Sequence, residues 1–203
     1  MSSPILEVKN ISKTFGNIKA LDNVDFYLQK GFVHGLLGEN GAGKSSLMNI
    51  LSGIYIPESG SIKINNQKIE KMTPDIAASF GIGMVHQEFR LIESFSIKDN
   101  LTLSKANIFT DNFKEAYDKY SEIFALNSNY LTTVNELSVG EKQKVEIMKL
   151  IFKNSQIMLL DEPTAVLTPQ ETSQLKDSLE KLSQEDEKTI VLITHKLKEI
   201  KDF

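Results

Sequence analysis

Residues 38–45 have the sequence Gly38-Glu39-Asn40-Gly41-Ala42-Gly43-Lys44-Ser45, which fits the pattern G-x-x-x-x-G-K-[ST]. Glycines at these spacings let the backbone curl so that its N–H groups point inward at phosphate oxygens. We expect Lys44 to reach the β- and γ-phosphates of a nucleotide, and the Ser45 hydroxyl to ligate Mg²⁺. The stretch predicts a phosphate-binding loop, and a Gly-rich structural turn is the alternative.

The residues on either side of this loop supply the setting that it requires. Phe32–Leu37 is nearly continuous apolar sequence, which predicts a strand buried on both faces. Lys44–Leu51 predicts a helix, whose N-terminus would add N–H donors and a favourable dipole for an anion. A buried strand before the loop and a helix after it favour the phosphate-binding interpretation over the structural turn.

Candidate strands and helices alternate along the rest of the chain. The candidate strands are Ile5–Lys9, Leu21–Leu28, Ser61–Ile64, Lys68–Ile69, Gly83–Val85, Ile157–Leu160 and Thr189–Ile193. The candidate helices are Pro74–Phe80, Asn112–Leu126, Gly140–Phe152, a helix opened by a capping box at Thr168–Glu171, and a helical start after His195. Leu101–Asn107 and Asn127–Thr133 are expected to be loops. This alternation predicts an α/β fold with a parallel sheet, into which the helical middle is inserted.

Composition narrows the class of protein. The chain has 203 residues, 40% of them hydrophobic and 25% charged, which favours one soluble globular domain over a disordered tail or a fibre. The absence of Cys excludes disulfide bonds and thiolate metal sites. A formal net charge of -4 disfavours a fold that grips nucleic-acid phosphates. No basic-then-apolar leader opens the sequence, and its apolar runs fall far short of the ~20 residues that span a bilayer.

Two adjacent acids follow the apolar run Ile157–Leu160. Asp161 would lie at the carboxyl end of a core strand, where a phosphate-binding-loop fold places the carboxylate that faces Mg²⁺. Glu162 could then polarise the attacking water, so the two acids would do different work. A solvated Asp-Glu pair at a strand end is the alternative.

Three further residues are uninformative one by one. His195 follows a β-branched strand, and a lone His is usually structural. Gln87 follows the candidate strand Gly83–Val85, and Phe15 is an aromatic residue of an N-terminal loop, most often plain core. Their significance depends on their order along the chain.

That order is recognisable. The motifs succeed one another as Phe15, Gly38–Ser45, Gln87, Leu137-Ser138-Val139-Gly140-Glu141, Ile157–Glu162 and His195. This arrangement resembles the ATP-binding cassette (ABC) ATPases over essentially the whole chain. The stretches His86-Gln87, Leu137–Gln143 and Glu162–Glu171 look most like importers of simple sugars and nucleosides, and Gly81–Gln87 leans towards the nucleoside branch.

The resemblance implies ATP and Mg²⁺ as cofactors and a role for each matching residue. Phe15 would stack on adenine, and Ser138 and Gly140 would contact the γ-phosphate of ATP held by a partner cassette. The implied catalytic residues are Lys44, Gln87, Glu162 and His195. The implied metal ligands are Ser45, Gln87 and Asp161. The implied nucleotide-binding residues are Phe15, Gly38, Asn40, Gly41, Gly43, Lys44, Ser45, Ser46, Ser138 and Gly140.

The resemblance also implies the organisation and the surroundings of the chain. We expect a single nucleotide-binding domain over residues 1–203, with residues 1–87 and 157–203 as a P-loop NTPase core that carries an N-terminal antiparallel β region, and residues 88–156 as a helical subdomain. The implied partners are a second cassette, a transmembrane permease and, indirectly, a substrate-binding protein, with no nucleic acid. The implied location is the cytoplasmic face of the cell membrane.

The sequence departs from the family pattern in three places. Val139 and Glu141 replace the third and fifth residues of the usual Leu-Ser-Gly-Gly-Gln signature. Thr168 stands where an Asp usually ties the two cassettes' sites together, which implies altered communication between them. The chain stops at Phe203, whereas cassettes of this family normally continue with further strands, so we expect the C-terminal end of the cassette to be missing.

Two other classes of protein remain as alternatives. A soluble ABC protein acting on nucleic acid or ribosomes would carry long coiled coils or basic linkers, which this sequence lacks. A self-contained P-loop kinase would not need the Leu137–Glu141 signature. The resemblance therefore favours an importer's ATPase.

Overall fold

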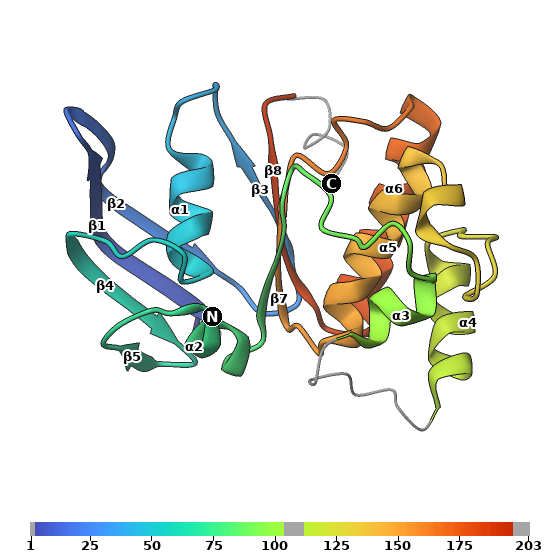
Figure 1. Ribbon diagram of the computed structural model, residues 1–203. Helices are drawn as coiled ribbons and strands as arrows, with labels where there is room; N and C mark the ends of the chain where they lie inside the picture. Colours follow the sequence, from blue (N-terminus) through green and yellow to red (C-terminus); the bar gives the residue numbers. More distant parts are fainter. Residues whose placement is uncertain (1–2, 104–111, 197–203) are drawn as a thin grey trace.

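The computed structural model describes residues 3–103 and 112–196, which form two four-stranded sheets (Figure 1). One sheet is antiparallel, in the order β2-β1-β4-β5, with strands β1 (Leu6–Phe15), β2 (Ile18–Leu28), β4 (Ser59–Ile64) and β5 (Gln67–Ile69). The other is parallel, in the order β3-β8-β7-β6, with strands β3 (Val33–Leu37), β6 (Ile82–Val85), β7 (Ile157–Asp161) and β8 (Thr189–Thr194). The α/β class with a parallel core and an antiparallel N-terminal region is confirmed.

Six α-helices and one short 3₁₀ helix connect the described strands. They are α1 (Lys44–Leu51), α2 (Pro74–Ser79), α3 (Ile97–Thr102), α4 (Phe113–Ile123), η1 (Val134–Glu136), α5 (Val139–Phe152) and α6 (Pro169–Glu185). Among residues 3–103 and 112–196, no helix has both the length and the apolar character needed to cross a membrane.

The parallel sheet separates two hydrophobic cores. Ile157 and Leu159 of β7 pack with α1 and the antiparallel sheet, whereas Met158 and Leu160 pack with α4, α5 and α6. Successive side chains of a strand point to opposite faces, so a continuously apolar strand fills both cores. Figure 1 shows the result, with α1 between the two sheets and α3 to α6 beyond the far face of the parallel sheet.

Two expectations from the sequence are wrong. The run Phe32–Leu37 is not buried on both faces, since β3 is an edge strand that pairs only with β8 among the described strands, and Phe32 and Leu37 are 60% and 42% exposed. Residues 101 and 102 are not loop but the end of α3, which begins at a capping box between Ser96 and Asp99. Residues 104–107 of that expected loop, and the expected helix from residue 197 on, lie outside the described residues.

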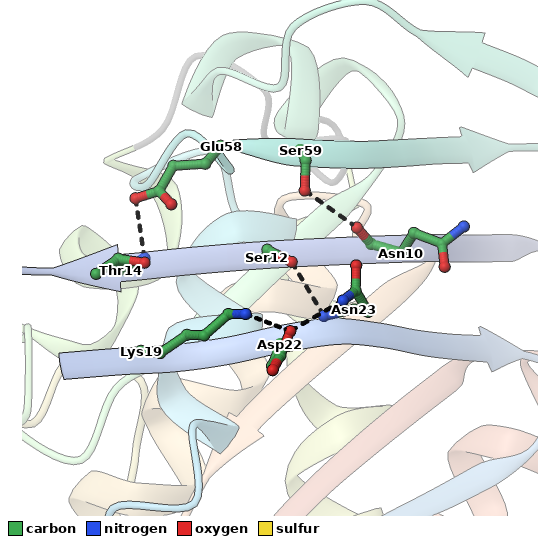
Figure 2. Close-up of polar contacts among 8 residues, drawn as sticks. All are labelled: Asn10, Ser12, Thr14, Lys19, Asp22, Asn23, Glu58 and Ser59. Atoms are coloured by element: carbon green, nitrogen blue, oxygen red, sulfur yellow. Dashed lines mark hydrogen bonds and ion pairs between the residues drawn. The ribbon is translucent and has the colours of Figure 1, made fainter.

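Bulges in the antiparallel sheet place the β1–β2 hairpin. The register of β1 shifts between Val8 and Ile11, and Asn10 and Asn23 take positive φ angles of 51° and 50°, which Asn tolerates better than most residues. Figure 2 shows side chains bonding the backbone there: Asn23 N donates to Ser12 Oγ at 3.0 Å, Thr14 N to Glu58 Oε1 at 2.9 Å, and Ser59 Oγ to Asn10 O at 3.4 Å. The hairpin that follows, from Phe15 to Ile18, is thereby fixed beside α1.

Candidate functional site

The loop between β3 and α1 has a backbone that requires glycine. Gly41 and Gly43 both have φ near 85°, in the left-handed region that is open mainly to glycine. A Cβ atom at Gly43 would also collide with the carbonyl oxygen of Ala20 on β2. The Lys44 ammonium donates to the carbonyl oxygens of Gly38 at 2.7 Å and Glu39 at 2.8 Å, so it lies within the curl of the loop.

A cleft of about 350 Å³ opens in front of this loop. Its walls come from four separate parts of the chain: the hairpin, the loop with the start of α1, the segment after β6, and the end of β7. The lining residues are Ile18, Ala20, Asn40, Gly41, Ala42, Gly43, Lys44, Ser45, Ser46, Gln87, Asp161 and Glu162. Sequence-predicted residues from three distant motifs therefore meet in one place.

Asp161 and Ser45 lie together at the floor of the cleft. The Ser45 hydroxyl donates a hydrogen bond to the Asp161 carboxylate. Burial raises the pKa of the Asp161 carboxyl above its usual range, the hydrogen bond from Ser45 opposes the rise, and the neighbouring Glu162 adds to it. Hydroxyl and carboxylate oxygens are the ligands that Mg²⁺ prefers, so these residues fit a magnesium ion. A bound cation would favour the charged form of the carboxyl.

Glu162 takes an unusual backbone conformation. Its φ is 48°, which is uncommon for a residue other than glycine, and its N–H donates to the carbonyl oxygen of Ile193 at 3.1 Å. The His195 Nδ1 atom lies 2.9 Å from Glu162 Oε1. His195 thus holds the carboxylate that sits beside Asp161 at the cleft. Backbone strain of this kind concentrates at functional sites.

A second hollow, of about 450 Å³, lies on the other side of the phosphate-binding loop. It is lined by Leu37, Gly38, Glu39, Asn40 and His195. Gly38, the first residue of the loop, and His195 therefore line this hollow and not the cleft that contains Lys44 and Asp161. Asn40 lines both hollows.

Phe15 stands apart from the cleft lining. Its ring is 40% exposed and packs edge-on against Tyr55, with ring centroids 5.1 Å apart. Its partner in the β1–β2 register is Ile18, which is 71% exposed and does line the cleft. Sequence reasoning missed Ile18 and Ala20, because only the pairing of β1 with β2 brings them to the loop.

Ser138 and Gly140 lie at the start of α5, on the opposite face of the parallel sheet from α1 (Figure 1). Neither lines the cleft described above. Ser138 caps α5: its hydroxyl accepts from Glu141 N at 3.2 Å, while its own N–H donates to Glu141 Oε2 at 2.9 Å. The Ser138 side chain also hydrogen-bonds the Glu141 carboxylate, so its hydroxyl is engaged within the capping box.

Glu141 and Glu171 support this helix start. The predicted Thr168–Glu171 capping box is confirmed, whereas sequence reasoning missed the capping box of Glu141 and the approach of Glu171 to Gly140. Glu141 closes the capping box and also accepts from the Ser128 hydroxyl at 2.5 Å, a role that a carboxylate performs well. Glu171 forms a second capping box with Thr168 at the start of α6, and a Cβ atom at Gly140 would collide with its carboxylate. A larger residue at Gly140 would displace this carboxylate from its place at the start of α6.

Similar proteins match nearly the whole chain. "Nucleoside import ATP-binding protein NupA" of Lactococcus lactis is 40% identical over 97% of this chain, and "Ribose import ATP-binding protein RbsA" of Caldanaerobacter subterraneus is 43% identical over 97%. This chain spans only 40% and 41% of their lengths. The dimeric structure of a bacterial ABC transporter cassette superposes with a TM-score of 0.83 at 28% identity, covering 97% of this chain and 90% of that one.

A family model described as "ABC transporter" matches residues 21–165, which run from the hairpin strand β2 through the phosphate-binding loop to the residues after Glu162. The match thus includes the start of α5 and every cleft-lining residue except Ile18 and Ala20, and extends over more than half of the sequence. The chain belongs to the ABC transporter family.

Proposed function

We propose that this chain is an ATP-binding and ATP-hydrolysing cassette that powers an ABC importer for nucleosides or simple sugars. The observation that carries the proposal is the meeting of Lys44, Gln87 and the Asp161-Glu162 pair in one cleft in front of a glycine-rich loop. The named relatives import a nucleoside and ribose, which supports the substrate class.

The phosphate-binding loop holds the nucleotide. Its N–H groups, the N-terminus of α1 and the Lys44 ammonium surround the phosphates, and Lys44 exchanges two backbone carbonyl partners for phosphate oxygens. Ser45, Asp161 and Gln87 would hold Mg²⁺, which neutralises charge on the β- and γ-phosphates when it is bound. Gly38, Asn40, Gly41, Gly43 and Ser46 shape the loop around the phosphates.

Glu162 acts on the attacking water. Its carboxylate accepts a proton from the water or orients it towards the γ-phosphate, and His195 holds that carboxylate in place through the 2.9 Å contact. Because Asp161 stands directly before it on β7, one acid serves the metal and the other serves the water.

The proposed assembly has two cassettes. Ser138 and Gly140 do not line the chain's own cleft, so their hydroxyl and backbone donors would complete the site of a partner, and a similar cassette has a dimeric structure. Residues 1–87 and 157–203 would form the catalytic core and residues 88–156 the helical subdomain. That subdomain would receive a helix of the permease at the cytoplasmic face of the membrane, and the permease would link the cassette to a substrate-binding protein.

Replacing Lys44 with Ala tests the nucleotide site. The change removes a charge-assisted contact to the phosphates, so the dissociation constant for Mg-ATP should rise about tenfold to about a hundredfold. Affinity is measured by equilibrium binding on the full chain. The control is Lys68→Ala, an exposed Lys of β5 on the antiparallel sheet. Equal affinities for the Lys44 variant and the wild type would refute the phosphate-binding assignment.

Importer function needs its own experiment. The gene is deleted in the source organism, and uptake of a labelled nucleoside and of a labelled simple sugar is measured in the mutant and in the complemented strain. We expect one of the two uptake rates to fall and to recover on complementation. If both rates stay at wild-type values, the proposed substrate class is wrong.

Replacing Phe15 with Ala tests the adenine contact. Stacking of a base on an aromatic ring contributes ~1–3 kcal/mol, so affinity should fall about tenfold for ATP and by a similar factor for GTP, because stacking uses the ring face of either base. Tyr27→Ala, an exposed aromatic residue at the other end of the hairpin strands, is the control. If only the control behaves like wild type, Phe15 holds the base; if both do, the base stacks elsewhere.

A further inference from the structure

Side chains on one face of α5, which we call the α5 stripe, bind the backbone of the segment that follows Gln87. Lys142, Glu146 and Lys149 are spaced by four and three residues, so they lie on one face of the helix. The backbone N–H of Arg90 donates to Glu146 Oε1 at 2.5 Å, and Lys149 Nζ donates to the carbonyl oxygen of Arg90 at 2.9 Å. Both polar backbone groups of Arg90 are therefore held by side chains of α5.

The two side chains that bind Arg90, those of Glu146 and Lys149, also form an ion pair with each other. Glu146 is only 4% exposed, and its Oε2 atom lies 2.9 Å from Lys149 Nζ. Lys142 adds an outer contact, with its Nζ atom 2.8 Å from Glu93 Oε1. A buried ion pair is weak support for stability, because apolar residues of similar size often do as well. Apolar residues would, however, leave the Arg90 backbone groups without these partners.

A second buried side chain fixes the segment two residues later. Asn100 of α3 accepts from Ile92 N at 2.8 Å and donates to the Ile92 carbonyl oxygen at 3.0 Å. It also donates to the carbonyl oxygen of Ser96, at the start of its own helix, at 3.0 Å. Residues 90 to 92 are thus attached to α5 and α3 at four backbone atoms.

Gln87 lies in the short span between this attachment and the parallel sheet. β6 ends at Val85, and the attached part begins at Arg90, which leaves residues 86–89 between them. A residue of extended chain spans at most ~3.6 Å, so fixing Arg90 limits how far Gln87, three residues before it, can move away. Gln87 lines the cleft, so the attachment of Arg90 to α5 helps to set where its side chain lies.

We propose that Glu146, with Lys149, is a positioning residue that fixes Gln87 in the nucleotide cleft through the backbone of Arg90. The proposal rests on the proposed function for the role of Gln87 in Mg-ATP binding. The attachment of Arg90 to α5 does not depend on the proposed function.

Amide hydrogen exchange tests the attachment on the full chain. Glu146→Ala removes the acceptor of Arg90 N–H, so exchange in residues 86–92 should become about tenfold faster while β8 keeps its protection. Glu146→Gln keeps an acceptor oxygen and should restore most of that protection. Lys149→Met, which keeps the packing of the stem, should also speed exchange there. The matched control is Glu180→Ala, since Glu180 is a mid-helix Glu of α6 that lies 3.9 Å from Lys176.

Unchanged exchange in residues 86–92 of both Glu146→Ala and Lys149→Met, or an equal increase throughout the chain, would overturn the proposal. A variant that fails to fold does not decide the matter, because Glu146→Gln and Lys149→Met test the same contacts with smaller changes in volume.

A double-mutant cycle tests the route through Gln87. In the wild-type background, Lys149→Met should weaken Mg-ATP binding about tenfold; in a Gln87→Ala background it should have little further effect. Independent, multiplying effects would mean that the α5 stripe acts on stability and not through Gln87. If Gln87→Ala alone leaves Mg-ATP affinity unchanged, the proposed role of Gln87 fails, and the exchange experiment alone upholds or overturns the attachment.

Discussion

We expect the Glu162→Gln variant to turn over ATP about 10²- to 10⁴-fold more slowly than the wild-type chain, and to bind ATP as tightly. Gln has nearly the same shape as Glu, so it fills the same space beside Asp161. It lacks the carboxylate, so it can no longer accept a proton from the attacking water. His195 Nδ1 lies 2.9 Å from Glu162 Oε1, and Gln keeps an oxygen that can make the same contact.

The measurement is steady-state phosphate release at saturating ATP, together with equilibrium ATP binding for each variant. Glu122→Gln serves as the control, because Glu122 is exposed on α4 and the cleft lining does not include it. Turnover of the Glu162→Gln variant near the wild-type rate would mean that another group activates the water. Loss of binding as well as turnover would mean that Glu162 supports the site's structure.

The residues of the cleft that could be predicted from the sequence are those with local signals. The glycine spacing of residues 38–45 follows from a backbone that must take left-handed φ angles, and Asp161 is marked by the apolar strand before it. Gln87 and His195 carry no such signal one by one; only their order among the other motifs points to them. Both follow parallel strands, β6 and β8, and so lie at the same edge of the sheet, Gln87 in the cleft and His195 in the second hollow.

The remainder depends on long-range packing that no local pattern encodes. Ile18 and Ala20 reach the cleft only because β2 pairs with β1 and Gly43 packs on the Ala20 carbonyl. The apolar run of β3 predicts burial, but burial of an edge strand depends on which strand lies beside it. Glu146 contacts the backbone N–H of Arg90, 56 positions away in the sequence. Nearly every residue has such an N–H, so no residue type in the sequence marks this contact. The start of α3 is different, because it has a local signal that the sequence analysis did not use: Ser96 and Asp99 form a capping box.

We expect ATP turnover per mole of chain to rise with protein concentration. Ser138 and Gly140 do not line the cleft that contains Lys44, so an isolated chain lacks those donors at the γ-phosphate. Loss of one preorganised donor typically lowers the rate by about 10²- to 10³-fold. The active species would then be a dimer, and its fraction follows mass action. Specific activity is measured over a wide dilution series, and rapid hydrolysis that is independent of concentration would contradict a shared site.

Mixing two inactive variants separates a shared site from a merely dimeric enzyme. In Ser138→Ala the chain keeps its own Glu162 but offers its partner a defective helix start, and in Glu162→Gln the defects are reversed. A dimer of one chain of each kind has one site with both defects and one with neither. Random pairing at equal amounts makes half of the dimers mixed, so about a quarter of wild-type turnover should return on mixing.

Loss of the Ser138 cap is a separate effect, because removing an N-cap side chain costs ~1 kcal/mol of stability by itself. The Ser96→Ala variant removes the equivalent hydroxyl from the capping box of α3 and leaves the start of α5 intact, so it measures that effect alone. We expect Ser96→Ala to turn over ATP nearly as the wild type does and to gain nothing when mixed with Glu162→Gln. No recovery in the Ser138→Ala mixture, although each variant binds ATP and dimerises, would mean that each chain hydrolyses ATP with its own residues alone.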